Sequence, residues 1–160
     1  MNTRPIQMLL AEDNASDTDL ILASLAKVAP AEAIHVVHDG VETLDFIFCR
    51  GEYTDRVQEP PLSVIVLDVK LPKIDGFEVL RELKADPRTR CIPVVMLTSS
   101  NIDRDVFRGY QLGANSYLQK PVDFERFRET IRQLGLYWIT MNEPPPARLA
   151  ATTPANDRGF

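Results

Sequence analysis

Five short apolar runs, separated by segments of helical periodicity, dominate the sequence. Such runs, exemplified by the one that ends at Leu67, are typical of strands buried on both faces of a parallel sheet. Strands that alternate with helices form parallel sheets with right-handed crossovers. We therefore predict strands at residues 6–11, 33–37, 63–68, 93–97 and 116–118. The predicted fold is α/β: a doubly wound, flavodoxin-like sheet of five parallel strands in the order 2-1-3-4-5, with helices on both faces.

The size and composition fit a single domain. Of the 160 residues, we assign 1–141 to the domain. Residues 142–160 are rich in proline, lack periodicity and are predicted to be a flexible tail. The net charge is −5 and Lys and Arg do not cluster, which argues against nucleic-acid and membrane binding. No apolar stretch reaches the roughly 20 residues that a membrane-spanning helix needs. With no signal peptide visible, we expect a cytoplasmic protein.

Polar side chains follow four of the predicted strands. Glu12 and Asp13 follow the first strand, Asp68 ends the third, Thr98 follows the fourth, and Lys120 follows the fifth. Each residue alone is weak evidence, because single polar residues at strand ends often cap helices or form turns. In the predicted order, however, the first and third strands are neighbours, so their three carboxylates should converge at one edge of the sheet.

The chemistry of this set indicates phosphoryl transfer. Three close carboxylates repel each other unless a cation lies among them or one keeps its proton. An oxygen-only donor set suits Mg²⁺. Lys120 and Thr98 would supply a positive charge and a hydroxyl donor to a phosphoryl group. Asp68, the central acid, is then the candidate nucleophile that becomes an aspartyl phosphate.

Residues 6–138 resemble the receiver domains of two-component response regulators. The motifs that carry this resemblance are the Glu12-Asp13 pair, the loop that holds Asp68, Pro72 and Gly76, Thr98 followed by Ser99, and Lys120-Pro121. The combination is highly specific and covers nearly all of the predicted domain.

The resemblance implies a metal site and an acceptor. Asp68 is expected to accept a phosphoryl group from the histidine of a sensor kinase. Asp13 and Asp68 are expected to bind Mg²⁺ directly, together with the backbone carbonyl of Lys70. Glu12 is expected to act largely through water.

The resemblance also implies a switch. Thr98 and Lys120 bind the phosphoryl oxygens after transfer in such proteins, and the aromatic residue at the position of Tyr117 moves inward with the threonine. The bond between Lys120 and Pro121 is expected to be cis.

Within the family, the chain is similar to the single-domain regulators paired with cyanobacterial and bacterial phytochromes. The motifs behind this similarity are Gly51-Glu-Tyr53, Pro60-Pro61, Lys70-Leu-Pro-Lys73 and Leu136-Tyr-Trp-Ile-Thr140. The implied partner is a phytochrome that acts as a sensor histidine kinase. Because only the tail follows residue 141, we expect a regulator that assists its own phosphoryl transfer and hydrolysis but carries no output enzyme. Its signal would be a changed surface around residues 102–113, 116–118 and 123–141.

The last predicted helix, 123–141, is apolar on more than one side. One stripe contains Phe124, Phe127, Ile131, Leu134 and Trp138, whereas Leu136, Tyr137 and Ile139 lie off it. A second apolar side favours a homodimer through the surface formed by the predicted helix 102–113, strand 116–118 and helix 123–141. The alternative is that the extra turn packs onto its own domain.

Two other functions remain open at this stage. One is a scaffold receiver that works without phosphorylation, although the full set of acids, Thr98 and Lys120 argues against it. The other is an aspartyl-phosphate phosphotransferase or phosphatase. Such enzymes usually need a second acid two residues after the nucleophile, where this chain has Lys70. The Lys70 side chain either reaches the acidic pocket or points into solvent.

Overall fold

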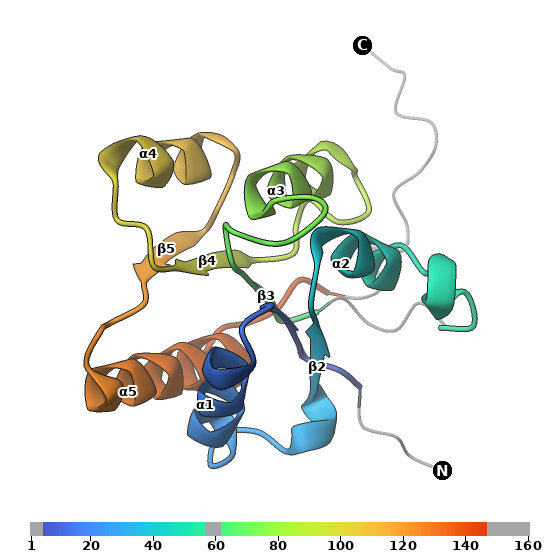
Figure 1. The fold of residues 1–160 in the computed structure, drawn as a ribbon. Coiled ribbons are helices and arrows are strands. Elements are labelled where there is room, and N and C mark those ends of the chain that lie inside the picture. The colour runs from blue at the N-terminus through green and yellow to red at the C-terminus, as the bar shows by residue number, and fades with distance from the viewer. Residues whose placement is uncertain (1–4, 57–61, 147–160) are drawn as a thin grey trace.

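A single parallel sheet forms the centre of the molecule (Figure 1). The computed structural model describes residues 5–56 and 62–146. The sheet has the order β2-β1-β3-β4-β5, so the predicted fold class and strand order are confirmed. Its strands are β1 (Met8–Ala11), β2 (Ile34–Val37), β3 (Val64–Leu67), β4 (Val94–Thr98) and β5 (Ser116–Gln119).

Helices cover both faces of the sheet. They are α1 (Ala15–Leu25), α2 (Gly40–Ile47), α3 (Gly76–Ala85), α4 (Asp103–Gln111) and α5 (Phe124–Gly135). Helices α1 and α5 lie together on one face, whereas α2, α3 and α4 lie on the other (Figure 1). Four of the five helices begin at a side chain that accepts a hydrogen bond from the backbone of the first turn, namely Asn14, Asp39, Asp75 and Asp123.

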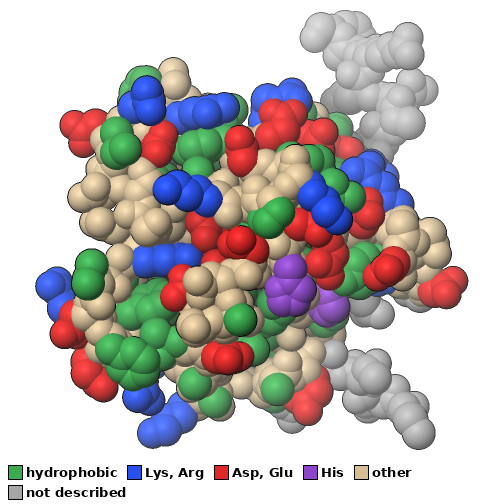
Figure 2. Space-filling model, viewed as in Figure 1, with side chains coloured by type: hydrophobic (Ala, Val, Ile, Leu, Met, Phe, Trp, Pro, Cys, Tyr) green, Lys and Arg blue, Asp and Glu red, His purple; other side chains and the backbone are tan. Residues whose placement is uncertain are grey.

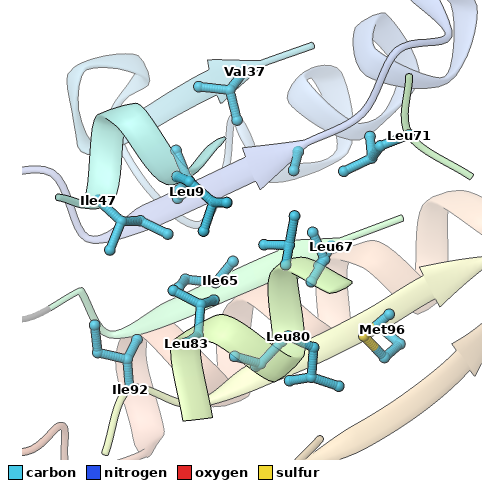
Figure 3. Packing of buried hydrophobic residues seen from close by; sticks show 14 of the residues in the cluster. Leu9, Val37, Ile47, Ile65, Leu67, Leu71, Leu80, Leu83, Ile92 and Met96 are labelled. Carbon is cyan, nitrogen blue, oxygen red and sulfur yellow. The ribbon is translucent and has the colours of Figure 1, made fainter. Parts of the chain in front are cut away.

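Each face of the sheet packs into its own hydrophobic core. Alternate residues of β3 point to opposite sides: Ile65 and Leu67 contact the α2 and α3 layer, and Val64 and Val66 contact the α1 and α5 layer. Figure 3 shows the first of these cores, in which Leu80 and Leu83 of α3 lie against the sheet. Burial on both faces explains why the strands have no polar alternation.

The loop between β3 and α3 is held closely against its surroundings. The backbone N–H of Gly76 donates to the carbonyl of Val69 at 2.8 Å. A Cβ atom on Gly76 would lie 2.1 Å from the carbonyl oxygen of Asp68, so only glycine fits here. The first residue of α2, Gly40, donates to the carbonyl of Pro72 at 3.1 Å and also lacks room for a Cβ atom. The backbone around Asp68 is therefore fixed by neighbours from two helices.

The predicted helix over 123–141 is present, but its last turns are not α-helical. The α-helix ends at Gly135, and residues Leu136–Met141 continue as a π-helical segment. Gly135 is buried against Leu25 of α1, and a Cβ atom there would lie 2.4 Å from the Leu25 Cδ2 atom. The wider π turns place both Trp138 and Ile139 against the α1 and α5 core, so Ile139 is not off the buried side as predicted.

Phe124 also differs from the prediction, because its side chain is 58% exposed rather than buried. It is the first residue of α5 and lies beside Arg128, whose guanidinium is 5.8 Å from the ring centroid. The exposed apolar side of the last segment is made instead by Leu136, Tyr137 and Met141.

Three further expectations concern the backbone and the chain ends. All peptide bonds of the described residues are trans, so the expected cis bond before Pro121 is absent. No helix in the described part is long and apolar enough to cross a lipid bilayer. The Pro60-Pro61 motif and the tail from residue 147 onward lie outside the described residues.

Candidate functional site: an acidic pocket with one buried lysine

Three carboxylates converge at the C-terminal edge of the sheet. Glu12 and Asp13 follow β1, and Asp68 follows the neighbouring strand β3. Each offers a carboxylate oxygen, and these atoms lie within 4.8 Å of one another. Glu12 and Asp68 are buried, whereas Asp13 is exposed. Acidic side chains gather near the centre of the face in Figure 2, between the two helical layers.

Lys120 enters the pocket from the end of β5. Its ammonium donates to Glu12 Oε2 at 2.7 Å, to Asp17 Oδ2 at 2.9 Å and to Asp68 Oδ2 at 3.0 Å. The Lys120 side chain is only 11% exposed. One cation therefore neutralises part of the charge of a pocket that holds four acids.

The remaining carboxylate oxygens are held by the backbone. The N–H of Asn14 donates to Glu12 Oε1 at 3.1 Å, and the N–H of Lys70 donates to Asp68 Oδ1 at 3.2 Å. Both buried acids thus use each of their oxygens, and their orientation is fixed. No buried side-chain oxygen or nitrogen in the described part of the chain lacks a hydrogen-bond partner.

The pocket raises the pKa of two groups, Glu12 and Lys120, for different reasons. Burial raises the pKa of Glu12 to about 7, against the hydrogen bond from Lys120, and the nearby Asp68 carboxylate adds to the rise. Burial alone would lower the pKa of Lys120, but its hydrogen bonds with Glu12 and Asp17 raise that pKa above its ordinary value. Lys120 therefore stays charged, and burial makes Glu12 costly to ionise.

The donor set fits a hard divalent cation. Glu12, Asp13 and Asp68 offer oxygen only, and the exposed Asp13 opens the site to solvent. Mg²⁺ prefers this kind of site, because it binds one or two carboxylates and keeps several waters. The side chain of Lys70 is exposed and makes no ion pair with any described residue, which favours the solvent-pointing alternative.

Thr98 and Tyr117 meet at the loop after β4. Thr98 is fully buried, its carbonyl accepts from Lys120 N at 2.7 Å, and its Oγ1 atom accepts from the N–H of Ser100 at 3.4 Å. The half-buried Tyr117 donates its hydroxyl to the carbonyl of Ser100 at 3.0 Å. The Ser100 hydroxyl in turn donates to Asp105 of α4 at 2.7 Å. Ser100 therefore links Thr98, Tyr117 and α4.

Comparison with known proteins identifies the family of the chain. The family model of the response regulator receiver domain matches residues 8–132. The chain belongs to this family. Among its relatives, the probable methanogenesis regulatory protein FilR2 of Methanothrix harundinacea is 36% identical over 144 residues, covering 88% of both chains.

Solved structures of phytochrome-associated regulators are also similar to this receiver. The phosphorylated cyanobacterial phytochrome response regulator RcpA has a TM-score of 0.79 and 32% identity, covering 89% of this chain and 99% of RcpA. The Mn²⁺-bound form of Rcp1, a regulator of Synechocystis sp., has a TM-score of 0.79 and 33% identity, covering 88% of this chain and 99% of Rcp1. The predicted family and its similarity to phytochrome regulators are confirmed.

The receiver pocket contains one residue that the sequence did not single out as a site residue. Asp17 lies in the first turn of α1, where a negative charge is favourable to the helix N-terminus whatever else it contacts. The same turn faces the C-terminal edge of the sheet, four residues after Asp13, and that spacing was the available signal. The predicted site residues Glu12, Asp13, Asp68 and Lys120 are brought together, with Thr98 on the adjacent strand. Their chemical roles stay predictions.

Proposed function

We propose that this receiver accepts a phosphoryl group on Asp68 from the phosphorylated histidine of a sensor kinase. The observation that carries the proposal is the contact between Asp68 and Lys120 in a pocket whose acids can also hold a cation. A carboxylate oxygen of Asp68 would form the new bond to phosphorus. The bond from phosphorus to the kinase histidine would break, and its electron pair would return to the imidazole nitrogen.

The other residues of the pocket would bind and orient the transferred group. Asp13 and Asp68, the backbone carbonyl of Lys70 and, through water, Glu12 would hold Mg²⁺, which would screen the negative charge of the phosphoryl oxygens. Lys120 would donate to one of those oxygens. The Thr98 hydroxyl would donate to another. Movement of Thr98 would shift Ser100, which contacts it, and through Ser100 it would shift Tyr117.

A single labelling experiment tests this proposal. With Mg²⁺ and acetyl phosphate, we expect the wild-type protein to gain the mass of one phosphoryl group, whereas Asp68→Asn should gain none. Labelling should also be lost when EDTA removes the metal. Asp75→Asn is a matched control, because Asp75 lies in the same loop but caps α3 and should leave labelling intact.

The other possible functions give different results in that experiment. A scaffold receiver would take up no phosphoryl group under any condition, which would contradict the proposal. A phosphotransferase or phosphatase would consume acetyl phosphate over many turnovers and show Asp68-dependent phosphate release far above the rate of adduct decay.

The partner and the output are further parts of the proposal. Similarity to RcpA supports a phytochrome as the sensor kinase, and a cytoplasmic location would follow from such a pairing. The receiver domain would span residues 1–141, and it would have no output enzyme activity and no nucleic-acid binding. Its signal would pass through α4, β5 and α5, where Ser100 and Tyr117 connect the pocket to the surface.

A homodimer through the same surface is a prediction of this proposal. Phe107 and Tyr110 of α4 are 65% and 51% exposed, and Phe124 at the start of α5 is also exposed. We expect sedimentation to show a mass that rises with concentration, and Phe107→Asp to lower this self-association. Val41→Asp is the control, because Val41 is an exposed apolar residue on α2. A constant monomer mass for the wild-type protein would contradict the prediction.

A further inference from the structure

Asp17 contacts the pocket without being one of its candidate metal ligands. Its Oδ2 atom accepts a hydrogen bond from Lys120 at 2.9 Å, and its side chain is 33% exposed. It does not belong to the group of close acids formed by Glu12, Asp13 and Asp68. Asp17 is therefore placed to act on the lysine rather than on the metal.

The ammonium of Lys120 is fully engaged in this arrangement. It has three N–H donors, and it makes three hydrogen bonds, to Glu12, Asp17 and Asp68. For Lys120 to donate to a phosphoryl oxygen on Asp68, at least one of these bonds must be given up or shared. Metal binding would occupy Glu12 and Asp68, which leaves Asp17 as the carboxylate that still holds the lysine.

We propose that Asp17 is a positioning residue that competes with a phosphoryl group on Asp68 for the N–H donors of Lys120 and so opposes the phosphorylated state. The inference rests on the proposed phosphorylation of Asp68. Asp17 opposes that state in two ways, because it neutralises part of the Lys120 charge and because its own negative charge repels the incoming phosphoryl oxygens. The unphosphorylated state is thus favoured by a residue outside the set that would bind metal and phosphate.

The contact between Asp17 and Lys120 should favour metal binding, although it opposes the phosphorylated state. Lys120 competes with a cation for Glu12 and Asp68, and Asp17 draws part of the lysine charge away from these two acids. Loss of the Asp17 charge should therefore weaken Mg²⁺ binding while it strengthens binding of a phosphoryl group. A general loss of folding would weaken both, so the pair of measurements separates a positioning role from a structural one.

Beryllofluoride, a stable mimic of the phosphoryl group on aspartate, provides the test. Its affinity at saturating Mg²⁺ can be measured by ¹⁹F NMR, and the affinity for Mg²⁺ alone by calorimetry. For Asp17→Asn we expect beryllofluoride to bind about two- to fivefold more tightly than to the wild type, the range of a partly exposed ion pair, and Mg²⁺ to bind more weakly.

Asp19→Asn is the matched control for charge. Asp19 lies on the same helix, is exposed, and makes no ion pair with any residue in 5–56 or 62–146. Its substitution should leave both affinities near the wild-type values. Equal effects of the two substitutions, or weaker beryllofluoride binding by Asp17→Asn, would overturn the inference while leaving the proposed function intact. Failure of the wild type to bind beryllofluoride would overturn both.

Discussion

Gly76→Ala should destabilise the protein by about 2–4 kcal/mol and strongly reduce phosphoryl uptake. The added Cβ atom would lie 2.1 Å from the carbonyl oxygen of Asp68 and 2.9 Å from the Cα atom of Val69. Both obstacles are backbone atoms, so no side-chain rotation can relieve the overlap. Either α3 moves away from the sheet or the backbone at Asp68 shifts.

A shift of Asp68 would separate its carboxylate from Lys120 and from the other acids. A displacement of about 1 Å in a reacting group commonly costs up to about 100-fold in rate. We therefore expect labelling by acetyl phosphate to fall by about 10- to 100-fold in Gly76→Ala. Urea unfolding and timed mass spectrometry would measure the two effects.

Gly109→Ala is the control for this substitution. Its Cβ atom would lie 3.1 Å from a ring carbon of Tyr117, a side chain that can adjust, and alanine favours the interior of α4. We expect a change in stability within about 1 kcal/mol and near-normal labelling. If Gly76→Ala were as stable and as readily labelled as Gly109→Ala, the loop would be more adaptable than its contacts indicate.

The contacts of this loop also show where prediction from the sequence stops. The strand that ends at Leu67 and the acid that follows it were predictable, because burial on both faces requires a continuous apolar run. The contacts that hold the loop between β3 and α3 in place were not predictable. Gly40 bonds to Pro72, and Lys73 pairs with Asp39 at 3.2 Å, but these residues lie more than one element apart in the chain. No local pattern indicates such a pairing.

Asp17 was overlooked for a different reason. An acid in the first turn of a helix has a sufficient local explanation in the helix dipole, whether or not it also contacts a distant lysine. The end of α5 was misjudged because a stripe at α-helical spacing predicts burial only while the helix keeps that spacing. After Gly135 the π turns alter this spacing, which buries part of Ile139, whereas Leu136 is exposed as predicted.

Loss of the Lys120 ammonium should also have a large effect on stability. Lys120→Met should lower the free energy of unfolding by about 2–4 kcal/mol when no metal is present. Methionine keeps most of the side-chain volume but leaves Glu12, which is 1% exposed, and Asp68 without a cation. Removal of one partner from a buried ion pair leaves an uncompensated charge, which is the costly case. Protonation of Glu12 limits the loss, since its pKa is already raised to about 7.

Lys73→Met separates this effect from the loss of any lysine. Lys73 pairs with Asp39, but its side chain is 64% exposed, so its removal should cost less than about 1 kcal/mol. Both variants can be compared by urea unfolding in EDTA. A cost for Lys73→Met as large as that for Lys120→Met would contradict the argument from burial.

Addition of Mg²⁺ should reduce the difference between Lys120→Met and the wild type. In the variant, a cation meets the acids without competition from an ammonium, so it should stabilise the variant more than the wild type. Phosphoryl uptake should nevertheless stay low, because no other cation lies within reach of Asp68 among the described ion pairs. Full labelling of a metal-stabilised Lys120→Met would show that the lysine serves the stability of the pocket and not the binding of the phosphoryl group.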